Sequence, residues 1–178
     1  MAIRNILKYP EKSLSQPSVT VDVIDDEIKQ LIQDMGETMF DDAGVGLAAP
    51  QVGINQRILV YDAHATDPEA REDIKEIIAL INPEIIATQG SFISEDEGCL
   101  SVVEYRANVK RYEKVTVKAL DMDGKQIQFE AEGILSVIMQ HEIDHLDGVL
   151  FIDRISPLKR AMYKKKRLKE LKKENEDT

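Results

Sequence analysis

The segment that most constrains this chain lies at residues 140–148, QHEIDHLDG, and it holds two of the three histidines in the sequence. Apolar residues around it recur at helical spacing, which predicts a helix over residues 133–148. Side chains four positions apart lie on one face of a helix, so His141 and His145 should point the same way. The rest of the chain must therefore fold around a helix that carries a pair of imidazoles on one face.

Periodicity elsewhere predicts both helices and strands. Residues 24–40 have apolar positions at helical spacing and acidic residues in the first turn, where the helix dipole favours them. A last helix should open at Ser156 and Pro157, because proline suits the first helical position. The other expected elements are strands at residues 57–62 and 79–86, a loop with a helical turn at residues 66–77, and a hairpin between residues 113 and 133 that turns at Asp123 and Gly124.

Neither repeats nor a linker rich in glycine and serine divide these elements, so one α+β domain is expected. A chain of 178 residues is long enough to bury a real hydrophobic core. No apolar run approaches the length of a membrane span, and the first residues, MAIRNILKYPEK, lack the apolar centre of a signal peptide. We therefore expect a cytoplasmic protein without a membrane partner.

Charge is unevenly distributed along the chain. Residues 1–157 carry 14 Lys and Arg against 29 Asp and Glu, whereas residues 158–173 carry nine basic groups and one acidic group. An acidic body repels phosphate backbones, which argues against a direct role on DNA. The basic tail is open to two interpretations: it contacts a polyanion, or it is a solvated helix. In the second case, these apolar residues would dock it: Leu158, Ala161, Met162, Leu168 and Leu171.

The two histidines suggest a metal site. Imidazoles at positions i and i+4 are the smallest helical chelate for a transition metal. Glu142 is rotated by about 60° from His145 on a helix, so it borders the same face and is placed to move protons without binding the metal. The alternative is that both histidines are ordinary helix residues paired with Asp144 and Asp147.

A hydrolytic metal site needs a third protein ligand. The only cysteine of the chain, Cys99, lies in SEDEGCLSVVEYR at residues 94–106. A thiolate with two imidazoles would leave a fourth position for water. Two alternatives stay open: Cys99 is a small buried apolar residue, or a carboxylate is the third ligand, as in HExxH zinc peptidases. The glutamates that follow His145 are Glu170, Glu174 and Glu176.

Residues 41–56, DDAGVGLAAPQVGINQ, are rich in small side chains. They formally match the GxGxxA dinucleotide fingerprint, but the preceding segment is predicted to be a helix and Pro50 interrupts any helix after it, so a phosphate loop is not expected. The composition argues against a packed helix or an ordinary strand. It suits a wall that a peptide backbone approaches closely, and Gln51 adds a donor and an acceptor at its end.

Together, three segments resemble the signature motifs of peptide deformylases, in the same order: GVGLAAPQ at residues 44–51, EGCLS at residues 97–101 and QHEIDH at residues 140–145. The resemblance covers nearly the whole chain. It implies small antiparallel sheets packed around a central HExxH helix, with a C-terminal helix. It also implies an enzyme that removes the formyl group from N-terminal formyl-methionine of nascent polypeptides through metal-bound hydroxide. One divalent ion per chain is implied, natively Fe²⁺, with Zn²⁺, Ni²⁺ or Co²⁺ as substitutes.

The resemblance also assigns roles by motif position. Cys99, His141 and His145 would bind the metal, and Glu142 would be the general base and acid. Gln51 and the backbone N–H of Leu100 would hold the oxyanion. The expected substrate-binding residues are Val45, Gly46, Arg106, Ile134, Val137 and Ile138, of which the aliphatic ones would form the methionine pocket. Arg106 is open to a second interpretation, a surface arginine paired with Glu95 or Glu104.

For organisation, the resemblance implies a catalytic domain at residues 1–157, with residues 158–178 as the C-terminal basic helix and tail of the same domain. That tail is similar to an element that contacts the ribosome near the exit tunnel, and a monomer is expected. A non-enzymatic alternative is an adaptor that holds a metal or binds the ribosome through the tail alone.

Overall fold

The computed structural model describes residues 2–176 and has the predicted α+β fold. Five antiparallel strands form the larger sheet in the order β1-β2-β3-β6-β7, and β4 pairs with β5 in a second sheet. The strands are β1 (Gly46–Ala48), β2 (Ile58–Asp62), β3 (Ile77–Gln89), β4 (Phe92–Cys99), β5 (Val102–Arg111), β6 (Lys114–Leu120) and β7 (Gln126–Glu132). The helices are α1 (Asp26–Asp41), α2 (Pro68–Asp73), α3 (Ile134–Leu146) and α4 (Pro157–Glu176), with short 3₁₀ turns at Lys12–Ser15, Ala49–Val52 and Phe151–Asp153.

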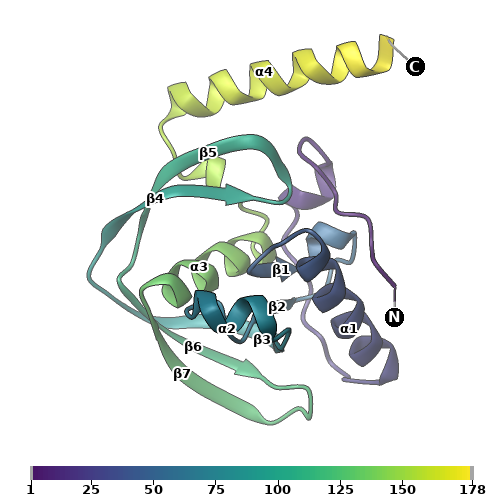
Figure 1. The fold of residues 1–178 in the computed structure, drawn as a ribbon, viewed down its shortest axis with the longest axis vertical. Coiled ribbons are helices and arrows are strands. Elements are labelled where there is room, and N and C mark those ends of the chain that lie inside the picture. The colour runs from purple at the N-terminus through teal and green to yellow at the C-terminus, as the bar shows by residue number, and fades with distance from the viewer. Residues whose placement is uncertain (1, 177–178) are drawn as a thin grey trace.

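Helices α1 and α3 pack on opposite faces of the larger sheet, and β2 lies between them (Figure 1). Side chains alternate along a strand, so Val60 joins the core under α1 while Leu59 and Tyr61 join the core under α3. All five residues of β2 are buried as a result. The predicted central position of the helix that carries the histidines is therefore confirmed.

The helix boundaries follow from local chemistry. The side chain of Asp25 caps α1 by accepting a hydrogen bond from the backbone N–H of Ile28 at 3.0 Å. Pro157 opens α4, as predicted from its position. The hairpin of β6 and β7 also matches the prediction, including its turn at Asp123 and Gly124.

The prediction that residues 41–56 contain no ordinary strand is wrong at residues 46–48, which form β1 and pair with β2. The small side chains explain this placement. A Cβ atom on Gly46 would lie 2.6 Å from Oε1 of Glu142, so only a residue without a side chain lets the strand pass so close to α3. After β1, Pro50 and Gln51 form a 3₁₀ turn.

Of the five apolar residues predicted to dock the last helix, four are exposed and Leu171 is half-buried. Leu158, Met162 and Leu168 are 72%, 64% and 49% exposed, respectively, whereas Tyr163 and Arg167 are buried. The ring of Tyr163 packs against Tyr105 with centroids 4.7 Å apart, and this aromatic contact decides which face of α4 turns inward. The rest of α4 extends away from the sheets (Figure 1). Among residues 2–176, no helix is both long enough and apolar enough to cross a membrane.

Candidate metal centre and substrate cleft

Cys99 at the end of β4 meets the two histidines of α3. The ligand atoms of Cys99, His141 and His145 all lie within 4.8 Å of one another. The Sγ atom of Cys99 is 3.2 Å from Nε2 of His145, and the two imidazole rings stand edge to face with centroids 5.0 Å apart. One sulfur and two nitrogens thus converge from segments that are more than 40 residues apart in the sequence.

The chemistry of this group fits a bound transition metal. Burial alone would raise the pKa of the Cys99 thiol, but the field of His145 and hydrogen bonds from both histidines lower that pKa well below its usual value. A thiolate is the form of cysteine that binds metals. Among the residues described, the buried Nδ1 of His145 and Oε2 of Glu142 have no hydrogen-bond partner. A soft anionic ligand beside two imidazoles suits a divalent transition-metal cation.

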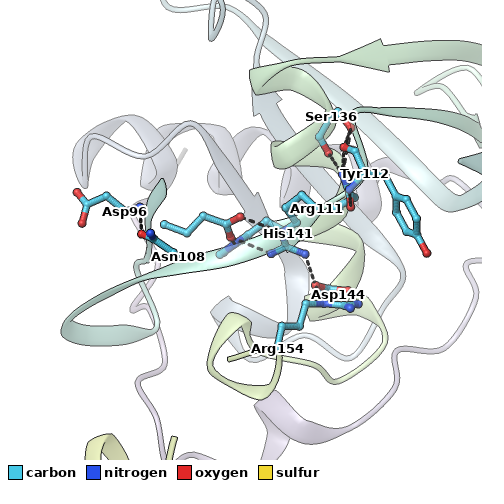
Figure 2. A network of polar contacts seen from close by, with 10 residues as sticks. Asp96, Asn108, Arg111, Tyr112, Ser136, His141, Asp144 and Arg154 are labelled. Atoms are coloured by element: carbon cyan, nitrogen blue, oxygen red, sulfur yellow. Dashed lines mark hydrogen bonds and ion pairs between the residues drawn. The ribbon is translucent and has the colours of Figure 1, made fainter. Parts of the chain in front are cut away.

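A buried network of charges supports His141 from behind (Figure 2). Nδ1 of His141 lies 3.4 Å from Oε2 of Glu97, and the guanidinium of Arg111 donates two hydrogen bonds of 2.8 Å to the same carboxylate. Burial would raise the pKa of Glu97, but hydrogen bonds from Arg111 and His141 dominate and lower it to about 2. The carboxylate therefore stays charged, and its contact with Nδ1 leaves Nε2 of His141 free to face a metal.

Arg111 extends this network to Asp144: its NH1 donates to Oδ2 of Asp144 at 2.7 Å. Asp144 is also paired with Arg154 (Figure 2). Asp147, the C-cap residue of α3, pairs with Arg57. The two aspartates are thus engaged by arginines, and the alternative that they pair with the histidines is wrong.

Glu142 lies beside the three ligand residues without belonging to the group of converging ligand atoms. Its side chain is almost fully buried, 5% exposed, and it contacts the backbone of Gly46 on β1. Burial raises the pKa of Glu142, although the fields of His141 and His145 oppose this effect. A carboxyl group whose pKa is raised toward neutral pH is suited to accept and return a proton.

Gln51 is held with its amide pointing at the cysteine. Its Oε1 accepts a hydrogen bond of 2.8 Å from the backbone of Ala48, which leaves Nε2 to donate to Ser101 Oγ at 3.2 Å and to face Cys99 Sγ at 3.7 Å. Leu100 follows Cys99 directly and is fixed through its carbonyl, which accepts from Nζ of Lys8 at 2.7 Å. The structure thus brings both residues next to the candidate metal ligands.

A cleft of about 840 Å³ opens over this group. One wall is formed by residues 43–46 and the other by the β4–β5 hairpin, with α3 below. All six residues expected to bind substrate line it: Val45, Gly46, Arg106, Ile134, Val137 and Ile138. His145 lies underneath and is 1% exposed.

Some features of the cleft were missed by sequence reasoning. Tyr105 lines the hairpin wall, and Glu97 lines the cleft while it supports His141. The side chain of Arg106 is 65% exposed and pairs with Asp96, whereas Glu95 or Glu104 was the expected partner. Glu97 lies two residues before the cysteine, but no local pattern points to its partner Arg111, because ion pairs between distant segments leave no periodic signal.

Comparison with known proteins decides the family. The family model for polypeptide deformylase matches residues 3–161. The chain belongs to this family. A peptide deformylase of Thermodesulfovibrio yellowstonii is 49% identical over 166 residues, which are 93% of this chain and 97% of the relative.

Solved deformylase structures have the same fold. The crystal structure of a peptide deformylase from Legionella pneumophila has a TM-score of 0.85 and 45% identity, and the match covers 96% of this chain and 98% of the other. A class I type b peptide deformylase from Acinetobacter baumannii, solved with Met-Ala-Ser bound, has a TM-score of 0.78 and 33% identity over 86% of this chain and 99% of the other. The resemblance inferred from the three motifs is confirmed.

The prediction of an enzyme is confirmed too, because the relatives are peptide deformylases. Membership in this family does not favour the HExxH zinc peptidase. The carboxylates considered for its third ligand, Glu170, Glu174 and Glu176, are residues of α4, and the converging group consists of Cys99 and the two histidines instead.

Proposed function

We propose that this chain removes the N-formyl group from the N-terminal formyl-methionine of nascent polypeptides. The observation that carries the proposal is the convergence of Cys99, His141 and His145 beside the buried Glu142, at the base of a cleft that is lined in part by aliphatic side chains. The Acinetobacter baumannii deformylase bound to Met-Ala-Ser supports a substrate that begins with methionine.

Cys99, His141 and His145 would hold one divalent metal ion per chain. When bound, such an ion acts as a Lewis acid that polarises a carbonyl and lowers the pKa of water. We propose Fe²⁺ as the native ion, with Zn²⁺, Ni²⁺ or Co²⁺ as substitutes, since a thiolate and two imidazoles suit all four. Glu97 keeps the ring of His141 oriented through Nδ1.

Glu142 would be the general base and then the general acid. Its raised pKa lets the carboxylate take a proton from the attacking water and return it to the departing amine. Formate and a free N-terminus would be the products. The contact with Gly46 holds the carboxylate at the base of the cleft while the proton moves.

Gln51 and Leu100 would stabilise the oxygen that becomes negative during attack on the formyl carbon. The amide of Gln51 is fixed at both ends by hydrogen bonds to Ala48 and Ser101, so it needs little reorganisation during the reaction. The backbone N–H of Leu100 would be the second donor. Loss of one such donor typically lowers turnover about 100- to 1000-fold.

The methionine side chain would enter the apolar part of the cleft formed by Val45, Ile134, Val137 and Ile138. The peptide backbone would lie between the wall at residues 44–46, including Gly46, and the start of β5, as an added strand. Arg106, largely exposed at the cleft, would position the peptide beyond its first residue.

The basic helix α4 would carry the enzyme to its substrates. Its long exposed part extends away from the body and carries most of the nine Lys and Arg residues of the tail (Figure 1). We assign residues 1–157 as the catalytic part and residues 158–178 as a helix and tail that contact the ribosome near the exit tunnel. The chain would act as a monomer in the cytoplasm, on formyl-methionine chains as they emerge. Removal of residues 157–178 should weaken binding to purified ribosomes, and unchanged binding would remove this role.

A direct test of the activity is formate release from formyl-Met-Ala-Ser under anaerobic conditions, with metal content measured on the same sample. We expect stoichiometric formate and a new free N-terminus. Acetyl-Met-Ala-Ser is the matched control and should not react, because the cramped site excludes the larger acyl group. A sample that holds one metal ion per chain and releases no formate contradicts the proposed function.

A further inference from the structure

Helix α2 presents one arginine to the wall of the cleft. Nε of Arg71 donates to Oδ2 of Asp62 at 2.8 Å, and NH2 of the same guanidinium donates to the carbonyls of Ala43 at 3.1 Å and Gly44 at 2.7 Å. The carboxylate of Asp62 is fully buried, and the side chain of Arg71 is 31% exposed. A single planar group therefore links a buried charge to two consecutive backbone carbonyls.

The local sequence builds α2 to hold this arginine. Asp67 caps the helix by accepting hydrogen bonds from the backbone N–H groups of Glu69 and Ala70, and Pro68 occupies the first helical position. The backbone of Arg71 then donates to the carbonyl of Asp67 at 3.0 Å. The helix has no buried residues, so its side chains contribute little to the hydrophobic core.

The backbone that Arg71 holds is strained. Ala43 has φ +53°, a left-handed conformation that residues with a Cβ atom rarely adopt. It follows the end of α1, where the backbone of Gly44 donates to the carbonyl of Met39 at 2.8 Å. The next carbonyl, that of Val45, accepts from the backbone of Asp62 at 3.0 Å. The carbonyls of three successive residues, 43–45, thus accept hydrogen bonds from the side chain of Arg71 or from the backbone of Asp62.

This segment is one wall of the substrate cleft. Residues 43–46 all line the cleft, and Gly46 lies against the carboxylate of Glu142. A Cβ atom on Gly44 would lie 3.0 Å from the side chain of Leu100, so the two sides of the cleft approach closely here. A shift of the segment would change both the edge offered to a peptide backbone and the space around Glu142.

We propose that Arg71 is a positioning residue for the substrate: it fixes residues 43–46 in the conformation that pairs with the peptide backbone. Arg71 touches neither substrate nor metal ligands, and it acts through the carbonyls of Ala43 and Gly44. The expected effect on KM rests on the proposed function. The conformational order of residues 43–46 can be measured whether or not the protein is active.

The experiment compares Arg71→Ala with the double variant Arg71→Ala/Asp62→Asn. The double variant removes the unpaired buried charge, and the introduced amide can still accept the hydrogen bond that Asp62 takes from the backbone of His64. Two measurements are made on the metal-loaded protein: steady-state kinetics with formyl-Met-Ala-Ser, which gives KM and kcat, and amide hydrogen exchange across residues 40–48. Glu72→Ala, an exposed change on the same helix, is the matched control.

Both Arg71 variants should raise KM about tenfold, with a smaller change in kcat, as expected when binding that the ground state and the transition state share is weakened. Exchange across residues 40–48 should rise about tenfold in both, because the segment opens more often. Glu72→Ala should match the wild type. If the double variant regains wild-type KM and exchange, Arg71 only neutralises Asp62 and the proposal is overturned.

The proposal is also overturned if the folded double variant has the KM and the exchange rates of the wild type from the start, whatever the single variant does. Failure of the proposed function looks different: the wild-type protein itself would release no formate, while the exchange comparison would still report on Arg71.

Discussion

Glu97 and His141 are joined by a contact of 3.4 Å between a carboxylate oxygen and Nδ1, and Arg111 holds that carboxylate from the opposite side. We predict that Glu97→Gln lowers the affinity for the metal ion by about 10- to 100-fold, the usual effect of losing an outer partner of a metal-binding histidine. Competition with a chelator of known affinity measures the change. Glu95→Gln, an exposed neutralisation two residues earlier, is the control and should keep wild-type affinity.

Glu142→Gln should separate metal binding from turnover. The amide keeps the shape of the buried side chain but accepts no proton, so kcat should fall by about 100- to 10,000-fold. Metal content should stay at the wild-type value, because the carboxylate is not one of the converging ligand atoms. Glu130→Gln on the exposed face of β7 serves as the comparison and should retain full activity. A fully active Glu142→Gln variant would remove the assigned role.

Asp34 should make stability depend on pH far from the cleft. Burial would raise its pKa, but hydrogen bonds from Gln30, the backbone of Ala2 and Arg4 lower it. A lowered folded-state pKa contributes stability above the unfolded value of about 3.9, and this contribution is lost as pH falls through the folded pKa.

Urea unfolding of the wild type and Asp34→Asn should therefore differ by about 2 kcal/mol at pH 7, as for a hydrogen bond to a charged group. The gap should shrink as pH falls below about 4, where the unfolded aspartate takes up its proton. A constant gap down to pH 2 would show that the charge of Asp34 contributes nothing.

Tyr163 should decide whether α4 stays docked. Its buried ring packs against Tyr9 and Tyr105, so Tyr163→Ala should weaken docking by about 3 kcal/mol, as for other large-to-small changes of buried aromatics. Hydrogen exchange of α4 measures the loss.

Two further variants control for this change. Tyr163→Phe should dock as well as the wild type or better, because the buried hydroxyl has no hydrogen-bond partner among the residues described. Leu158→Ala should change docking by less than about 0.5 kcal/mol, since Leu158 is 72% exposed. A larger effect at Leu158 than at Tyr163 would reverse the assignment of the docked face.

The sequence predicted those features that follow from local periodicity and from motif position. The helix at residues 133–148, the hairpin that turns at Gly124 and the start of α4 at Pro157 each depend on neighbouring residues, which is why spacing and turn chemistry were enough. The geometric expectation that His141 and His145 share a face needed only the repeat of a helix.

Other features depend on contacts between distant segments, and periodicity cannot reveal those. Arg111 meets Asp144 across 33 positions, and Arg71 reaches Gly44 across 27. The docked face of α4 was misjudged for the same reason: the aromatic partner of Tyr163 lies on β5, so a count of aliphatic residues along the helix pointed to the wrong side.

The tight approach of Gly46 to Glu142 also limits how this enzyme can be redesigned. Even a methyl group at position 46 would lie 2.6 Å from the carboxylate oxygen of Glu142. Substitutions at position 46 are therefore of no use in a library of variants. Variation aimed at bulkier acyl groups belongs instead on the hairpin wall of the cleft, which Leu100 and Tyr105 line.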